Sequence, residues 1–347
     1  MTMVRAQIDD SRVLRLVADN APVTMLDTEV GPDRAWRGKD IGPQDWLIRL
    51  PGEVLDEVTH LVTQMRKAPL PLLLRAPQQF DLPQSRELMR RVRHTLTDGI
   101  GLAVVDRLPL EQLSREEATA AYWVLGQLMS SPVATKWDGT MLYDVRDTGQ
   151  RFGFGVRGSA TNVELSFHTD NGFGVTLPRF VGLLCLQQAR SGGVSRFCSL
   201  YTVHNELLSR APDLLRRLYQ PMYFDRQAEF APGAPAVLWA PMFRYEDGQL
   251  SVRLVRNLVR RGYTLMEEEM DAPLVAALDL LDSVLADESL QVEFTIEPGQ
   301  LQYLNNLECG HYRSTFEDFD EPERKRHLIR VWYRDHGAPT YDGYPVD

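Results

Sequence analysis

Apolar side chains recur at helical spacing in the first third of the chain. Between Pro51 and Pro69 they stand three and four residues apart, at Leu55, Val58, Leu61, Val62 and Met65. Residues at this spacing share one face of a helix, so the pattern predicts an amphipathic helix that ends before Pro69. A second helix is expected over about residues 83–96. Ser114 with Glu117 three residues later forms a capping-box pattern, which predicts a third helix start.

Short apolar runs bounded by turn residues predict strands in the remainder of the chain. They lie at residues 101–105, 179–186, 194–198, 291–296, 301–305 and 328–333. Helices are expected between them, at residues 200–208, 213–219 and 272–286, and Asp247-Gly248 predicts a tight hairpin turn. The basic run from Arg253 to Arg261 is interpreted as a strand face with a solvated turn. Many short strands with helices inserted between them predict a mainly β fold with flanking helices and a double-stranded β-helix (jelly-roll) core.

The whole chain is expected to form a single domain. It has 347 residues, 44% of them hydrophobic, which is enough for a sizeable core. About residues 1–100 are interpreted as an N-terminal helical flank, and about residues 101–335 as the jelly-roll core with helical insertions. The sequence leaves the oligomeric state open, and a homo-oligomer is compatible with it.

Charge and cysteine content narrow the class of protein. The net charge of −10 argues against nucleic acid as a partner, since such binding relies on Lys and Arg neutralising phosphates. Three cysteines without a Cys-x-x-Cys spacing argue against a disulfide framework and favour a reducing cytoplasm. Residues 1–17 lack the apolar core of a signal peptide, and no apolar run reaches membrane-spanning length. A cytoplasmic protein without a membrane partner is therefore expected.

The segment from residue 138 to residue 166 has an unusual composition. It contains five glycines and three arginines, Arg146, Arg151 and Arg157. Glycine-rich connections of this kind are often mobile and cover active sites. An ordinary irregular loop would have the same composition, so both interpretations stay open.

A candidate metal site lies at His168 and Asp170. In a strand, residues two apart point to the same side, so these two side chains can bind one ion. Two histidines and one carboxylate with open positions are typical of non-haem Fe(II) oxygenases. A His-x-Asp pair alone also fits a surface turn, so a second imidazole is needed.

Strand parity distinguishes the two remaining candidates for that imidazole. The other histidines are expected on helices or near the C-terminus, at His60, His94, His204 and His336. In the strand after residue 326, Arg326 and Arg330 share one face and His327 lies on the other. If the arginine face points inward, His327 packs outward and His311 is the ligand.

The two arginines on one strand face are themselves informative. Buried charge is costly unless it is paired, and guanidinium binds carboxylates through two parallel hydrogen bonds. Arg326 and Arg330 therefore indicate an anionic ligand. Pairing with nearby acids is the alternative, and the candidates are Glu317, Asp318, Asp320 and Glu321.

These motifs together resemble a known family. They are His168-x-Asp170, Gly192-Gly193-x-Ser195, Asn305-Asn306 before His311, and the run from Arg326 to Trp332. In this order they are similar to the TauD/TfdA family of Fe(II)/2-oxoglutarate-dependent dioxygenases, which includes the clavaminate-synthase-like enzymes. The resemblance extends from about residue 46 to residue 332.

The resemblance implies roles for individual residues. It makes His168, Asp170 and His311 the iron ligands. It makes Arg326 the partner of the distal carboxylate of 2-oxoglutarate, assisted by the hydroxyl of Ser195, where many relatives have threonine. Another departure is His311-Tyr312-Arg313, since relatives often read His-Gly-Arg.

The resemblance also implies a substrate-binding region. Arg330 matches the family's arginine for a substrate anion, which suits a small carboxylate-bearing substrate, an amino acid or a biosynthetic intermediate. Candidate further contacts are Glu164, Asn162, Arg256 and Asn257, for which surface roles are the alternative.

The implied reaction consumes dioxygen and 2-oxoglutarate and releases succinate and CO2. Related halogenases replace the ligand carboxylate by a small residue so that chloride can bind, whereas this chain keeps Asp170. Hydroxylation is therefore expected, with desaturation or ring formation as alternatives. The other functions considered are a non-catalytic metal- or ligand-binding jelly roll and a zinc hydrolase built on the same three ligands.

Overall fold

The largest sheet supplies one wall of the protein's interior. The structure is a computed structural model that describes residues 12–19 and 22–343. The seven-stranded sheet runs in the order β2 (Leu47–Arg49), β3 (Leu102–Asp106), β15 (Leu301–Asn305), β7 (Phe180–Gln187), β18 (His327–Arg334) and β4 (Ser131–Val133), with β5 (Leu142–Val145) paired to β18. Its pairs are antiparallel except β2 with β3. Its central strands are the apolar runs that the sequence predicted as strands.

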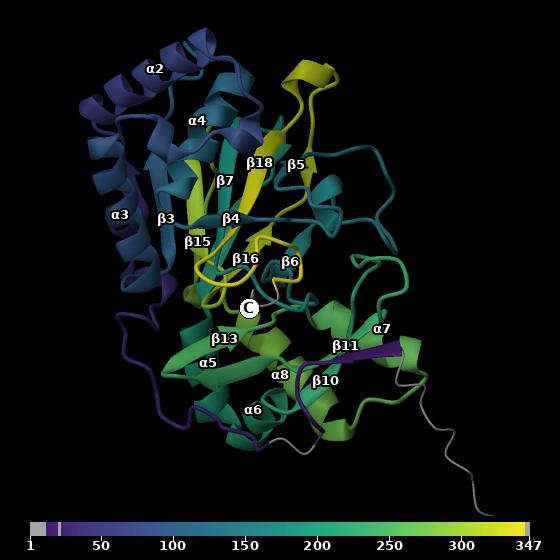
Figure 1. Ribbon diagram of the computed structural model, residues 1–347. Coiled ribbons are helices and arrows are strands. Elements are labelled where there is room, and N and C mark those ends of the chain that lie inside the picture. Colours follow the sequence, from purple (N-terminus) through teal and green to yellow (C-terminus); the bar gives the residue numbers. More distant parts are fainter. Residues whose placement is uncertain (1–11, 20–21, 344–347) are drawn as a thin grey trace, which may run out of the picture.

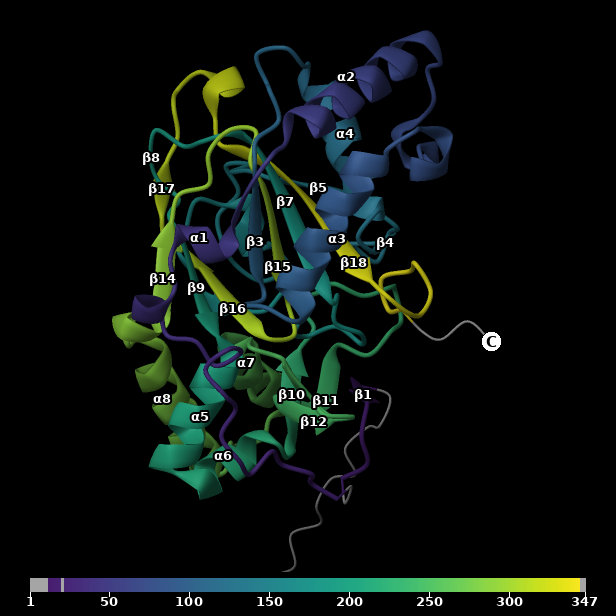
Figure 2. The same cartoon turned by 90° about the vertical axis from the view of Figure 1, so that its left-hand side faces the viewer.

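A second, smaller sheet faces the first. Its order is β14 (Gln291–Phe294), β9 (Ser195–Ser199), β16 (Cys309–Arg313) and β6 (Leu165–His168), all antiparallel. Phe197 and Cys309 from this sheet pack with Val181, Leu304 and Trp332 from the large sheet in one apolar cluster. Figure 2 shows the small sheet on one side of the large sheet and the helices on the other. Side chains that point between the sheets therefore line a shared interior.

Three helices cover the outer face of the large sheet (Figure 1). They are α2 (Gly52–Lys67), α3 (Pro83–Thr97) and α4 (Arg115–Gln127). The predicted helices are confirmed, and Ser114 caps α4 as expected, since its Oγ accepts from the amide of Glu117. One detail was wrong: Val54 rather than Leu55 is buried in the core. The capping residue and the apolar repeat are both local signals, which is why they were readable from sequence.

Gly126 sets how closely α4 approaches β18. A Cβ at this position would lie 2.0 Å from the Oη of Tyr333, which is fully buried. Gly126→Ala is therefore expected to destabilise the fold by about 1–3 kcal/mol through overpacking, although alanine ordinarily favours a helix. The measurement is urea unfolding, with Gly52→Ala as control, because a Cβ there meets nothing within 4 Å. Equal stability of the two variants would contradict this packing account.

A lobe of helices and short strands is inserted between β9 and β14 and lies below both sheets (Figures 1 and 2). Its helices are α5 (Leu200–Arg210), α6 (Pro212–Leu218), α7 (Arg256–Met266) and α8 (Ala272–Leu285). Its strands are β10 (Pro221–Asp225), β11 (Val237–Pro241), β12 (Phe243–Glu246) and β13 (Gln249–Val252), and β1 (Val13–Arg15) pairs with β11. The helices predicted at 200–208, 213–219 and 272–286 are confirmed as α5, α6 and α8, and the turn at Asp247-Gly248 joins β12 to β13.

The basic run was interpreted wrongly. It forms the start of α7 rather than a strand face, and the apolar residues of α7 are buried at helical spacing, at Leu258, Val259, Gly262, Tyr263 and Met266. Nor is Arg253 solvated: its guanidinium donates to the carbonyls of Gly172, Gly174 and Val175 at 3.1, 2.6 and 2.9 Å. These partners lie about 80 residues away in sequence, so no local pattern indicated them.

The remaining elements are short. They are α1 (Pro43–Trp46), β8 (Ser191–Gly192), β17 (Phe316–Glu317), and the 3-10 turns η2 (Gly38–Asp40), η3 (Leu72–Leu74), η4 (Pro77–Gln79), η5 (Gly158–Ala160), η6 (Glu288–Leu290) and η7 (Pro322–Arg324). The mainly β architecture with several helices is thus confirmed. In the described part of the chain, no helix is both long and apolar enough to cross a membrane. Most of the stretch on which a leader peptide was discounted, residues 1–11, lies outside the described residues.

Candidate functional site

Pairing of β6 with β16 brings the predicted metal ligands together. His168, the last residue of β6, is the register partner of His311 on β16, and Asp170 follows two residues later. The Nε2 atoms of the two imidazoles lie 3.7 and 3.6 Å from Oδ1 of Asp170. One ligand atom from each residue lies within 4.8 Å of the others, which is close enough for one ion. His327 is on the opposite face of β18, 2.6 Å from Asp144, as strand parity predicted.

Asp170 is held at both its backbone and its carboxylate. The side-chain amide of Asn306 accepts from the amide of Asp170 at 2.7 Å and donates to its carbonyl at 3.0 Å. The carboxylate accepts from Nε1 of Trp332 at 2.7 Å and lies 3.0 Å from Nη1 of Arg330. Burial opposes ionisation, but Arg330 and His311 outweigh it and hold the pKa of Asp170 well below its usual value. The group is therefore an anion with a fixed orientation.

The imidazole of His168 is arranged as a neutral donor. Nδ1 of His168 lies 2.9 Å from the carbonyl of Ser166, which fixes the proton on that nitrogen and leaves Nε2 free to bind a cation. Burial, with the neighbouring His311, lowers the pKa of His168 to about 3, so it stays uncharged near neutral pH. Two imidazoles and one carboxylate are the donor set that suits Fe(II) with open positions. The residues present thus fit an iron ion.

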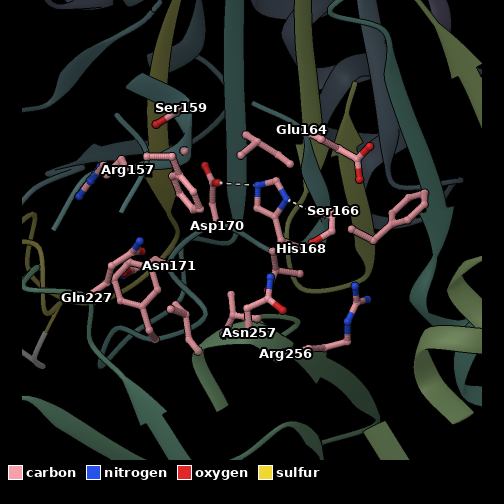
Figure 3. Close-up of a pocket in the computed structure, with 18 of the residues that line it drawn as sticks. Arg157, Ser159, Glu164, Ser166, His168, Asp170, Asn171, Gln227, Arg256 and Asn257 are labelled. Atoms are coloured by element: carbon pink, nitrogen blue, oxygen red, sulfur yellow. Dashed lines mark hydrogen bonds and ion pairs between the residues drawn. The ribbon is translucent and has the colours of Figure 1, made fainter. Parts of the chain in front are cut away.

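A cavity of about 220 Å³ opens at His168 and Asp170. Figure 3 shows Glu164 on one side of the pair, Arg157 on the other, and Arg256 with Asn257 below them from α7. Of the predicted substrate contacts, Glu164, Arg256, Asn257 and Arg330 line this cavity. Asn162 is exposed and does not line it, so the structure does not bring that residue to the site.

Arg330 on β18 and Arg326, which directly precedes β18, have different surroundings. Arg330 is paired with Asp170, so its protein partner is an acid other than the four considered from sequence. The side chain of Arg326 is buried, and its Nη1 has no hydrogen-bond partner in the described part of the chain. Burial lowers the pKa of Arg326 to about 10, still well above neutral pH. Asp318 accepts a hydrogen bond from the backbone amide of Arg326 at 2.8 Å.

The double glycine lies against Arg326. Gly193 has a φ of +69°, and a Cβ there would be 3.2 Å from Nε of Arg326. Gly192, with a φ of +73°, would place a Cβ 2.2 Å from the carbonyl of Thr315 where β8 meets β17. Both positions favour glycine, because an L side chain is strained at positive φ. A Cβ at Gly192 would also collide with the backbone, and one at Gly193 would press on Arg326. The chain then enters β9, which begins with Ser195, two residues after Gly193.

Several site residues were not found from the sequence. Trp332 shares its strand face with Arg330, so parity could have indicated it. Arg313 lies two residues after His311 and is buried. Arg157 comes from the glycine-rich segment, whose residues Phe152, Gly158 and Ser159 also line the cavity. That segment therefore borders the site, although composition alone could not place it there.

A family model and two known proteins match most of this chain. Residues 66–332 match the model of the taurine catabolism dioxygenase TauD, TfdA family. FR-33289 synthase from Streptomyces rubellomurinus (strain ATCC 31215) is 30% identical over 256 residues, which are 72% of this chain and 74% of that protein. The taurine hydroxylase-like protein SAT17 of Stachybotrys chartarum (strain CBS 109288 / IBT 7711) is 25% identical over 316 residues, 87% and 79% of the two chains.

Solved structures show the same fold. Asparagine oxygenase in complex with Fe(II), 2S,3S-3-hydroxyasparagine and succinate has a TM-score of 0.63 at 18% identity, covering 85% of this chain and 98% of that one. The non-heme iron oxygenase OrfP in complex with Fe and alpha-ketoglutaric acid has a TM-score of 0.63 at 15% identity, covering 87% and 100%. Neither a zinc hydrolase nor a non-catalytic binding protein agrees with the family match. The match over residues 66–332 and the 30% identical relative show that this chain belongs to the TauD/TfdA family and is an Fe(II)/2-oxoglutarate-dependent dioxygenase.

Proposed function

We propose that this dioxygenase hydroxylates a small carboxylate-bearing molecule, an amino acid or a biosynthetic intermediate, and releases succinate and CO2. One observation carries the proposal: three arginines line the 220 Å³ cavity beside His168 and Asp170, and each has a buried N–H without a hydrogen-bond partner among residues 12–19 and 22–343. These atoms are Nη1 of Arg157, Nη1 of Arg256 and Nε of Arg330. Buried guanidinium groups with unused donors favour an anionic guest.

The proposed metal ligands are His168, Asp170 and His311, held by the two facing sheets, which we take as a double-stranded β-helix. When bound, Fe(II) with 2-oxoglutarate and dioxygen supplies the oxidising chemistry, and the protein supplies orientation and exclusion of water. Arg326 and Ser195 are proposed to hold the distal carboxylate of 2-oxoglutarate. Gly193 supports this role, because the absence of a side chain there lets Arg326 lie against the start of β9.

Arg330 is the proposed anchor for the substrate carboxylate. Its ion pair with Asp170, at 3.0 Å, offsets its charge while no cation is bound to that carboxylate. A metal cation bound to Asp170 would neutralise the carboxylate that now pairs with Arg330. The positive charge of Arg330 would then attract another anion more strongly. Its guanidinium also lies over the rings of Tyr143 and Trp332, at 4.9 and 5.2 Å, which fixes its plane.

The other walls fit the rest of an amino acid. Glu164 lines the cavity and is proposed to face a substrate ammonium group, while its Oε2 accepts from Tyr312 at 2.9 Å. Arg256, paired with Asp282 at 2.5 Å, keeps one donor for the substrate. Asn162 is left out because it lies outside the cavity. The same substrate class is supported by solved relatives described with hydroxylated amino acids, 3-hydroxyasparagine and 3-hydroxyarginine.

We further propose that residues 1–347 form one dioxygenase domain in the cytoplasm. β1 and β2, both within the expected N-terminal flank, pair with β11 of the lobe and β3 of the large sheet. Cys185, Cys198 and Cys309 are buried and free, which agrees with a reducing compartment. A homo-oligomer stays a prediction.

Anaerobic titration with Fe(II) and 2-oxoglutarate is expected to give a visible charge-transfer band. Admission of oxygen with the correct substrate should then release succinate, and a panel of carboxylate-bearing metabolites screened for substrate-triggered succinate identifies it. Hydroxylation adds one oxygen to the product mass, whereas loss of two hydrogens would show desaturation or ring formation. Stimulation by esters as strong as by the free acids would contradict the carboxylate anchor.

A further inference from the structure

A second buried arginine lies beside Arg326. Arg313 follows His311 by two residues on β16, so both side chains point between the sheets. Its Nη2 donates to the carbonyl of Thr161 at 3.0 Å and to that of Val163. Its Nε and Nη1 are buried and have no hydrogen-bond partner in the part of the chain that the structure describes. Two of the three nitrogens of this guanidinium are therefore unused by the described residues.

The guanidinium groups of Arg313 and Arg326 both lie over the ring of Phe316. Their guanidinium carbons lie 4.8 and 5.1 Å from the centroid of Phe316. Both guanidinium groups are cations near neutral pH, because arginine stays protonated in proteins. Two like charges thus lie close together in a dry region, which is costly unless an anion joins them.

The protein's own acids compensate this pair only in part. Asp147 attracts Arg313 and Asp318 attracts Arg326. Within residues 12–19 and 22–343, however, no carboxylate accepts a hydrogen bond from either guanidinium. Asp318 uses Oδ1 for the backbone amide of Arg326, and its Oδ2 is buried without a partner. The N–H donors that face inward are therefore left for a guest.

The distance from His311 to the pair of Arg313 and Arg326 suits the length of 2-oxoglutarate. Ser195 on β9 is the register partner of Arg313, so its side chain lies on the same face of the small sheet as that of Arg313. Arg313 lies about 7 Å along β16 from His311. A five-carbon chain spans roughly 5 Å between its terminal carbons. A dicarboxylate bound at His311 by one end would thus reach this pair of arginines with the other.

We propose that Arg313 is a second cation of the 2-oxoglutarate site: Nε and Nη1 hold the distal carboxylate opposite Arg326, while Nη2 holds the backbone at Thr161 and Val163. This inference rests on the proposed role of Arg326. It gives one residue two tasks, since the same guanidinium positions the cosubstrate and the segment that leads into His168. It also makes a distal carboxylate a strong requirement, because without one both cations stay uncompensated.

The test compares 2-oxoglutarate with 2-oxopentanoate, which has the same chain length but no distal carboxylate. Dissociation constants are measured by calorimetry on Mn(II)-loaded protein, a readout independent of turnover. Arg313→Met is expected to weaken 2-oxoglutarate binding at least about 30-fold and to leave 2-oxopentanoate binding unchanged. Arg313→Lys should recover part of the loss, because it restores the charge without the planar fork.

The matched control is Arg196→Met. Arg196 is the neighbour of Ser195 on β9, but it is paired with Glu293 and lies over the ring of Tyr312, on the other face. This variant should keep the full preference for 2-oxoglutarate. If Arg313→Met weakens the binding of 2-oxoglutarate and 2-oxopentanoate equally, or changes the binding of neither, the inference is overturned and Arg313 is a structural residue.

Arg326→Met separates the inference from the function on which it rests. If Arg326→Met removes the preference for 2-oxoglutarate and Arg313→Met does not, only the second cation is wrong. If neither variant changes the preference, the location of the cosubstrate site is wrong. Should Arg313→Met fail to fold for lack of its bonds to Thr161 and Val163, Arg313→Lys decides: a preference equal to that of the unaltered protein overturns the inference.

Discussion

Replacement of Asp170 by alanine is expected to abolish Fe(II) binding and succinate formation, with activity reduced at least about 1,000-fold. Asp170 is the proposed anionic ligand, and its oxygen lies 3.7 and 3.6 Å from the two imidazoles that complete the site. Without it, the two imidazoles have no anion beside them to offset the positive charge of Arg330, which repels a metal cation. The measurements are equilibrium iron binding under anaerobic conditions and succinate release in the presence of oxygen.

The same substitution is also expected to destabilise the fold. Asp170 and Arg330 are both buried, and removal of one partner of a buried ion pair costs about 3–5 kcal/mol. Asp170→Asn separates the two effects, since it keeps the volume and an oxygen for the hydrogen bond from Trp332 but lacks the charge. It should fold better than Asp170→Ala and still bind iron poorly.

Asp144→Ala is the matched control for Asp170. Asp144 is another carboxylate next to an imidazole, 2.6 Å from His327, but it belongs to the neighbouring strand β5 and lies outside the cavity at His168 and Asp170. Iron binding and activity should survive its removal. Retention of tight iron binding by Asp170→Ala, or its loss in Asp144→Ala, would show that the metal centre is assigned to the wrong carboxylate.

Arg326→Met is expected to raise the concentration of 2-oxoglutarate needed for half-saturation by about 100-fold, while iron binding is unchanged. The arginine is buried, carries an unused donor and lies against Gly193, so it is prepared for an anion that the protein does not supply. Methionine keeps much of the side-chain volume and removes the charge. The substitution should therefore weaken 2-oxoglutarate binding without disturbing the packing of the fold. The measurement is 2-oxoglutarate saturation followed by succinate.

His327→Ala provides the comparison for Arg326→Met. His327 is the next residue in the chain, but its side chain faces Asp144 and the outside of the sheet. Its 2-oxoglutarate saturation should match that of the unaltered protein. A normal saturation curve for Arg326→Met would remove Arg326 from the cosubstrate site and leave its burial without a functional reason.

Local periodicity was enough to predict much of the fold. The apolar repeats of α2 and α3 and the capping box at Ser114 depend only on residues within one or two turns. α7 was missed because Arg256 and Arg260 made its sequence look solvated. Their partners, Asp282 and Asp279, belong to α8. Charge pairing between two helices cannot be inferred from either helix alone.

The alternation of side chains along a strand was the main basis for predicting the site from the sequence. The two-residue period of a strand is a property of the backbone, so it is enough to place Arg326 and Arg330 on one face and His327 on the other. It also gives His168 and Asp170 a common direction. Parity gives the face of a strand but not the strand that lies opposite, and so it could not show that Asp170 receives its hydrogen bond from Trp332, 162 residues away.

The sequence by itself therefore determined the mainly β class, most helices, the family motifs and the candidate ligands, since each is encoded within a short stretch. Only the tertiary structure decided which distant groups meet. Arg330 turned out to face Asp170, Asn162 to lie outside the cavity, and Arg313 to lie beside Arg326 across Phe316. The physical reason is that hydrogen-bond register between strands far apart in the chain sets these distances, and burial by all surrounding elements sets the cost of each charge.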